Sequence, residues 1–136
     1  MKFFHRLALF LAAPALLSAA EVAKVATIAP AEAAKLVTAG KAVLVDVREP
    51  QEWAQTGVAQ PAVLLAKSDF DGAQKDWKPF LASVGSKQVI LYCRTGHRSG
   101  LVADELARKG VNVANAGALK DWVDAGLPVR KVEPAK

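Results

Sequence analysis

The sequence is poor in the residues that build disulfide frameworks and metal sites. It holds one cysteine and two histidines in 136 residues. A single thiol excludes an intramolecular disulfide, a Cys-x-x-Cys redox pair and any zinc site that needs two thiolates from this chain. We therefore expect no metal and no cofactor. Whatever Cys93 does, it does without a second thiol of the same chain.

A strong excess of charge of one sign is also missing. The 18 basic and 13 acidic residues give a formal net charge of +5, and 52% of the residues are hydrophobic. This composition is that of a folded chain, and its length allows one ordinary domain. The basic residues are scattered without interleaved aromatic residues, so we expect no binding of nucleic acid.

The first twenty residues have the pattern of an export signal. Lys2, His5 and Arg6 precede an apolar stretch at Leu7 to Leu17, and small residues follow at positions 18–20. The apolar stretch is too short for the roughly 20 residues of a membrane-spanning helix. We expect cleavage after Ala20, a periplasmic or otherwise exported domain at residues 21–136 with a polar tail from about residue 131, no membrane attachment after cleavage, and a monomer.

Strand patterns alternate with helix patterns along the mature chain. Short apolar runs rich in β-branched residues predict strands, and apolar residues at spacings of three and four predict helices. The predicted strands lie at residues 42–47, 62–65, 88–92 and 111–113, and the predicted helices at 31–39, 49–55, 73–84, 99–109 and 119–125. This alternation predicts an α/β fold, with a mainly parallel central sheet and helices on both faces. Ligands bind such sheets at the carboxyl ends of the strands.

Cys93 follows directly on the clearest of these strands. The segment from Cys93 to Arg98 connects the strand at residues 88–92 to the next helix and contains Gly96. A short loop of this kind can direct its backbone N–H groups inward, and the helix N-terminus adds positive charge. A cysteine there, beside arginine, has a lowered pKa and a nucleophilic thiolate. The alternative is a buried structural cysteine, the usual fate of a lone thiol.

Four segments, in order, resemble the rhodanese family of sulfurtransferases. They are Val45–Glu49 (VDVRE), Glu52-Trp53, Tyr92–Ser99 (YCRTGHRS) and Asn115–Trp122 (NAGALKDW). The resemblance implies a rhodanese-like three-layer fold and transfer of a sulfane sulfur from thiosulfate, or a similar small anionic donor, through a persulfide on Cys93. It implies cyanide, a thiol or a protein sulfur acceptor as the second substrate.

The resemblance also assigns roles to the residues of the loop. Cys93 is the catalytic nucleophile, and the substrate-binding residues are Arg94, Thr95, Gly96, His97 and Arg98. The two arginines would attract the donor, while Thr95 and Gly96 would contribute backbone groups. Whether the side chains of Arg94 and His97 face the pocket or the solvent stays open.

Asp46 and Arg48, at the end of the first predicted strand, are interpreted as structural support beneath the site. The resemblance favours a hydrogen-bonded or ion-paired brace for them, one that can involve Glu49 or Glu52. A direct catalytic role for these two residues is the less favoured interpretation.

Two other functions share the same features. The first is a non-catalytic sulfur carrier or partner-binding domain that hands a persulfide to another protein. The second is an oxyanion reductase or phosphatase on the same fold. Four residues separate Cys93 from Arg98, one fewer than in the cysteine-dependent phosphatases, and no second thiol is present to resolve a reductase intermediate.

Overall fold

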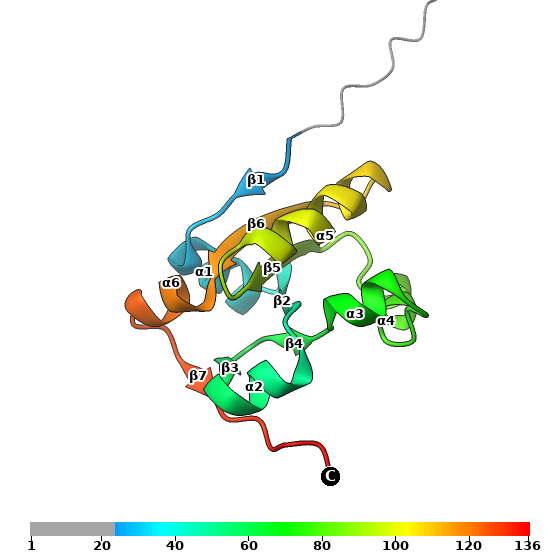
Figure 1. The fold of residues 1–136 in the computed structure, drawn as a ribbon. Helices are drawn as coiled ribbons and strands as arrows, with labels where there is room; N and C mark the ends of the chain where they lie inside the picture. The colour runs from blue at the N-terminus through cyan, green and yellow to red at the C-terminus, as the bar shows by residue number, and fades with distance from the viewer. Residues whose placement is uncertain (1–23) are drawn as a thin grey trace, which may run out of the picture.

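Apolar residues on both faces suit β2 (Ala42–Asp46) and β5 (Gln88–Cys93) to the interior of the sheet, where both are inner strands. The computed structural model describes residues 24–136 (Figure 1), so the predicted signal peptide lies outside the described residues. The five-stranded sheet has the order β1-β6-β5-β2-β4, and each pair of neighbours is parallel. The third inner strand is β6 (Val113–Ala118), and the edge strands are β1 (Ala26–Thr27) and β4 (Val63–Leu64). The predicted mainly parallel sheet is confirmed.

Helices cover both faces of this sheet, as predicted. One face packs against α5 (His97–Arg108), α3 (Lys67–Asp71) and α4 (Trp77–Ser83), and the other against α1 (Pro30–Thr38) and α6 (Leu119–Asp124). Figure 1 shows α5 crossing in front of the sheet. Alternate residues of β5 belong to different layers, because side chains alternate along a strand. Leu91 and Cys93 lie in the core beneath α5, while Ile90 and Tyr92 lie in the core beneath α1 and α6.

A small second sheet closes the carboxyl end of β2. After β2 the chain forms α2 (Pro50–Thr56) and then β3 (Val58–Ala59), which pairs antiparallel with β7 (Val129–Arg130). These three elements lie together at the bottom of the view in Figure 1. They place α2 beside the loop that follows β5. Among residues 24–136, no helix is long and apolar enough to span a membrane.

The helix predicted at residues 73–84 is shorter than expected and begins at Trp77. The carboxylate of Asp69 accepts the backbone N–H groups of Lys75, Asp76 and Trp77 at 2.7, 2.9 and 3.1 Å. These three N–H groups therefore do not make the hydrogen bonds of a helix interior. Gln74 has a φ of +54°, which also interrupts a helix. The residues before it form α3, which apolar spacing alone does not indicate.

The strand predicted at residues 111–113 is displaced, since β6 runs from Val113 to Ala118. It pairs with β5 as far as Cys93. Its sequence, VANAGA, is rich in small residues with weak strand propensity, so tertiary pairing decides its length. The helix predicted from Ser99 begins earlier, at His97, which brings its N-terminus closer to Cys93.

Candidate active site

Cys93 is the last residue of β5 and lies at the carboxyl edge of the sheet. Its exposed fraction is 0%, and it belongs to the core between the sheet and α5. The sulfur is nevertheless not surrounded by hydrocarbon alone. The backbone N–H of Gly96 donates to Cys93 Sγ at 3.0 Å, and Ser99 Oγ lies 3.5 Å from the same sulfur.

The loop after Cys93 curls because Gly96 adopts a conformation that side chains disfavour. Gly96 has a φ of +93° and is the residue immediately before α5. A positive φ costs glycine little and most other residues considerably more. This turn directs the Gly96 amide back toward Cys93 and starts α5 with its positive end near the sulfur.

The polar surroundings of Cys93 favour its thiolate. Burial acts against ionisation, but hydrogen bonds from the Ser99 hydroxyl and from the amides of Ser99, Thr95 and Gly96 outweigh it and lower the pKa of the Cys93 thiol. A lowered pKa means that a larger share of the thiol is in the nucleophilic form near neutral pH.

Two further residues at the site carried no predicted role. Ser99 Oγ donates to Asn115 Oδ1 at 2.8 Å, and Asn115 Nδ2 donates to the carbonyl of Gly96 at 3.0 Å. Asn115 opens the last of the four segments of the rhodanese resemblance, and Ser99 closes the third. Their positions in those segments were the only indication in the sequence that they belong to the site. The parallel pairing of β6 with β5 then shows that Asn115 reaches the loop.

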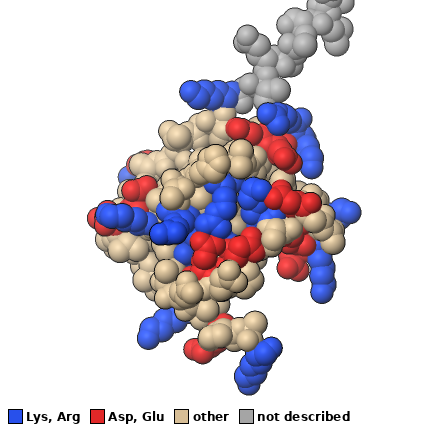
Figure 2. Space-filling model, viewed as in Figure 1, with Lys and Arg blue, Asp and Glu red and all other residues tan. Residues whose placement is uncertain are grey.

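Arg98 points to α2 and not to the sulfur. Its Nη1 and Nη2 donate to the two carboxylate oxygens of Glu52 at 2.7 and 2.8 Å. The Arg98 hydrogen bonds hold the pKa of Glu52 at about 2, against the weaker opposing effect of burial. Glu52 Oε2 also accepts the backbone N–H of Glu49 at 2.9 Å, which caps α2. Figure 2 shows basic and acidic side chains side by side in the middle of the viewed face.

Asp46 and Arg48 form a buried ion pair behind the loop. Arg48 Nη2 lies 2.8 Å from Asp46 Oδ2, and Arg48 Nε lies 3.1 Å from both oxygens of that carboxylate. Arg48 also donates to Thr56 Oγ1 and to the carbonyl of Gly57, each at 2.8 Å. The pair therefore ties β2 to the end of α2. The further partners of Arg48 are thus oxygens of Thr56 and Gly57 and not a glutamate, while the support of the site by this pair stays a prediction.

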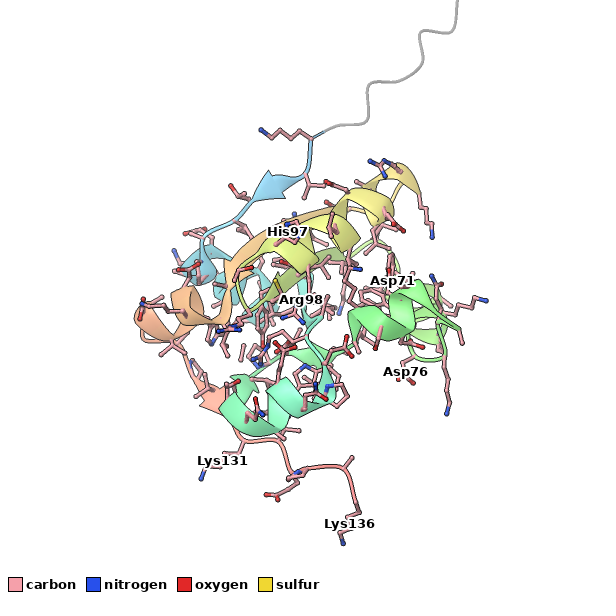
Figure 3. The ribbon with its side chains drawn as sticks, in the orientation of Figure 1. Asp71, Asp76, His97, Arg98, Lys131 and Lys136 are labelled. Carbon is pink, nitrogen blue, oxygen red and sulfur yellow. The ribbon has the colours of Figure 1, made fainter. Side chains whose placement is uncertain are left out.

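A hollow of about 670 Å³ opens beside the loop. Its walls come from Arg94 and Thr95, from α2 and from α6. Arg94 and Thr95 are exposed, so both are available to a bound molecule. His97 is exposed but does not line this hollow, and Figure 3 places it on the other side of α5 from Arg98. The residues that the structure describes contain no cluster of histidine, cysteine and carboxylate side chains suited to a metal ion.

The fold and this site define an α/β domain in which one cysteine ends a parallel strand and accepts a backbone N–H from the loop that follows it. A comparison with protein-family models matches residues 29–125 to the rhodanese-like domain. The chain belongs to the rhodanese family.

Two curated proteins are similar in sequence. An uncharacterised protein of Synechocystis is 33% identical over 111 residues, which are 80% of this chain and 58% of that protein. A Schizosaccharomyces pombe protein, provisionally named a mitochondrial thiosulfate sulfurtransferase, is 33% identical over 94 residues, 60% of this chain and 63% of that protein. The chain therefore spans about three fifths of the length of these relatives.

Solved structures include both sulfurtransferases and a protein of another suggested activity. The polysulfide-sulfur transferase homodimer of Wolinella succinogenes matches with a TM-score of 0.63 at 25% identity, over 81% of each chain. A human single-domain sulfurtransferase matches with 0.55 at 27%, over 72% of this chain and 95% of that one. A Rhodopseudomonas palustris protein of unknown function, described as a possible tyrosine phosphatase, matches with 0.66 at 27%, over 78% and 85%.

Proposed function

We propose that this domain transfers sulfane sulfur from thiosulfate, or a similar small anionic donor, to cyanide or a thiol through a persulfide on Cys93. Its membership of the rhodanese family and its likeness to sulfurtransferases support the proposal. The observation that carries it is the Gly96 amide at 3.0 Å from Cys93 Sγ, with the Ser99 hydroxyl on the same sulfur. These donors stabilise an anionic sulfur without a general base.

The reaction has two balanced displacements. In the first, the Cys93 thiolate attacks the outer sulfur of thiosulfate, a new S–S bond forms, the old one breaks, and sulfite leaves with the electron pair. In the second, cyanide or a thiolate attacks the outer sulfur of the persulfide, and the Cys93 thiolate leaves. The enzyme thiolate is restored, and no oxidant or reductant is consumed.

The hollow beside the loop is the route by which the donor approaches. Arg94 and Lys120 bring positive charge to its wall, which favours an anion. Lys120 also pairs with Asp124, so Arg94 is the stronger attractor of the two. Cys93 is fully buried and does not line the hollow. Sulfur transfer therefore requires the segment 94–96 to open toward the hollow.

The mass of the intact protein after exposure to thiosulfate, and then to cyanide, tests the proposal. We expect one sulfur to be added and then removed, with thiocyanate as product. Cys93→Ser should lose both events. Ser83→Ala, a change in α4 whose hydroxyl bonds only its own helix turn, is the matched control and should retain them. Thiocyanate formation by Cys93→Ser at the normal rate would exclude Cys93 as the nucleophile.

The complete burial of Cys93 favours a second candidate, a sulfur carrier that another protein opens and loads. This candidate predicts slow turnover with small donors together with a persulfide that persists for hours. The turnover rate and the persulfide lifetime, both measured with thiosulfate as the only donor, separate the carrier from the enzyme.

Phosphatase chemistry receives less support from the geometry, despite the likeness to the Rhodopseudomonas palustris protein. A phosphate is best bound by a guanidinium that presents two N–H groups to it. In Arg98 both terminal nitrogens already donate to Glu52, so a phosphate bound by them would lie beside that carboxylate. Hydrolysis of an aryl phosphate that Cys93→Ser abolishes would reverse this ranking.

We also propose that residues 1–20 direct export and that the released domain is a monomer. The charged start and short apolar stretch support export. Fractionation of cells, followed by N-terminal sequencing, should find the chain outside the cytoplasm and starting at Glu21. Light scattering of the released domain tests its monomeric state.

A further inference from the structure

Ser99 has one hydroxyl hydrogen and two neighbours that can accept it. Asn115 Oδ1 lies 2.8 Å from Ser99 Oγ, and Cys93 Sγ lies 3.5 Å from it. An amide oxygen can only accept, a thiol can donate or accept, and a thiolate can only accept. The direction of the Ser99 hydrogen therefore depends on the charge on the Cys93 sulfur.

The orientation of the Asn115 amide is fixed by backbone groups and not by Ser99. Asn115 Nδ2 donates to the Gly96 carbonyl, and Asn115 Oδ1 accepts the N–H of Gly117 at 3.0 Å. The reversed amide would set oxygen against the Gly96 carbonyl and N–H against the Gly117 N–H. Both bonds would be lost, so Asn115 always presents its oxygen to Ser99.

We propose that the Ser99 hydroxyl is a one-hydrogen switch that follows the charge on Cys93 Sγ, and that Asn115 is the positioning residue that holds it. When Cys93 is a thiol, its S–H donates to Ser99 Oγ and the Ser99 O–H donates to Asn115. When Cys93 is a thiolate, the Ser99 O–H turns to the sulfur. Asn115 Oδ1 keeps the Gly117 N–H as a partner, so the turn leaves no acceptor unpaired.

The exchange favours the thiolate because it replaces a neutral hydrogen bond with a charged one, which is roughly twice as strong. In the persulfide the charge lies on the outer sulfur, so the hydrogen returns to Asn115. Ser99 thus assists the first displacement by stabilising the Cys93 thiolate before it attacks. It assists the second by stabilising the same thiolate as it leaves. This part rests on the proposed function, whereas the response of the thiol to Ser99 does not.

Other charges near Cys93 stay in place during this exchange. Arg98 of α5 interacts with the charge of Cys93 without a hydrogen bond to the sulfur, and its partner Glu52 belongs to α2. Neither contacts Ser99 or Asn115 by a hydrogen bond among the described residues. Substitutions at Ser99 and Asn115 therefore leave this ion pair as it is.

The pH dependence of Cys93 alkylation by iodoacetamide tests the switch without any sulfur donor. We expect Ser99→Ala to raise the pKa of Cys93 by about one unit, because the thiolate loses a charged hydrogen bond. Ser83→Ala, the same chemical change in α4, should leave it unchanged. An unaltered pKa in Ser99→Ala would overturn the proposal.

Asn115→Asp separates positioning from simple electrostatics. A carboxylate of the same shape holds the Ser99 hydrogen more firmly, adds negative charge and loses the bond to the Gly96 carbonyl, so the pKa of Cys93 should rise further. If Asn115 acts through Ser99, the double variant with Ser99→Ala should show less than the sum of the two single shifts. Additive shifts would mean that the carboxylate acts by charge alone, and would overturn the positioning role.

The outcome is distinguishable from a failure of the proposed function. Absence of thiocyanate from the wild-type protein would contradict sulfur transfer and leave the alkylation result standing. Thiocyanate formation at the normal rate in Ser99→Ala at low pH, with an unchanged thiol pKa, would contradict the switch alone.

Discussion

Gly96 lies so close to Gly117 that a Cβ atom on Gly96 would come within 3.1 Å of the Gly117 Cα. This contact seats the loop after Cys93 directly on β6, where Asn115 also binds the Gly96 carbonyl. The loop is thus held by the strand next to β5 and not by its own residues alone.

Gly96→Ala should therefore displace the loop and abolish most sulfur transfer. Strain at a positive φ costs about 1–2 kcal/mol on its own. Gly110→Ala is the matched control, since Gly110 has a φ of +82° and nothing within 4 Å of an added Cβ. Urea denaturation should show a larger loss of stability in Gly96→Ala than in Gly110→Ala, and thiocyanate assays should show loss of activity in Gly96→Ala only. Equal effects of the two substitutions would contradict the close contact.

The ion pair of Glu52 with Arg98 should stabilise the fold down to unusually low pH. The pKa of Glu52 falls from 4.5 to about 2 in the folded protein, so its stabilising contribution is complete above pH 4.5 and disappears as the pH falls through about 2. Both side chains are partly exposed, so we expect about 1–2 kcal/mol. The Tm difference between the wild type and Glu52→Gln, followed from pH 7 to pH 2, measures it.

The control for that experiment is Glu32→Gln, which removes an exposed ion pair with Lys35 in α1. Exposed pairs of this kind contribute little, so its Tm should follow that of the wild type. A Tm difference for Glu52→Gln that persists unchanged at pH 2 would contradict the role of its charge.

Breaking the buried pair of Asp46 with Arg48 should destabilise the fold strongly. Asp46 has 0% and Arg48 has 2% of its surface exposed. Loss of one partner leaves the other charge buried and unpaired, which costs about 3–5 kcal/mol. Asp46→Ala should show this loss in chemical denaturation, while Asp46→Ala combined with Arg48→Met should recover part of it. No recovery in the double variant would mean that the bonds of Arg48 to Thr56 and Gly57 matter more than its charge.

Tyr92 should resist ionisation until the protein unfolds. It is the single tyrosine of the sequence, and its hydroxyl oxygen accepts the Ala59 N–H at 2.9 Å. Burial first, and then the neighbouring Asp46 carboxylate, raise the pKa of Tyr92 far above its ordinary value. A raised pKa means that stability is complete below about pH 10, the ordinary value, and falls above it.

Absorbance at 295 nm during alkaline titration should therefore rise only together with the loss of helical circular dichroism. Tyr92→Phe removes this signal and identifies its source. Tyrosinate formation near pH 10 in a chain that is still folded would contradict the burial of the hydroxyl.

The sequence predicts the architecture and the place of Cys93 in it better than the contacts at the site. Apolar runs located β2 and β5, and the strand-to-helix position of Cys93 indicated a loop of inward amides. The Arg98–Glu52 pair and the Ser99–Asn115 bond join segments that are 46 and 16 residues apart. Pairing of this kind depends on sheet order and register, which local periodicity does not encode. For the same reason the start of α4, set by Asp69, could not be read from apolar spacing.

The burial of Cys93 also affects how the thiol withstands oxidation. A sulfur with no accessible surface meets a dissolved oxidant or a bulky disulfide only during intervals when the surrounding structure opens. The frequency of those intervals then limits both productive turnover and chemical damage. Any substitution that makes this opening more frequent should increase both the rate of sulfur transfer and the rate of oxidation.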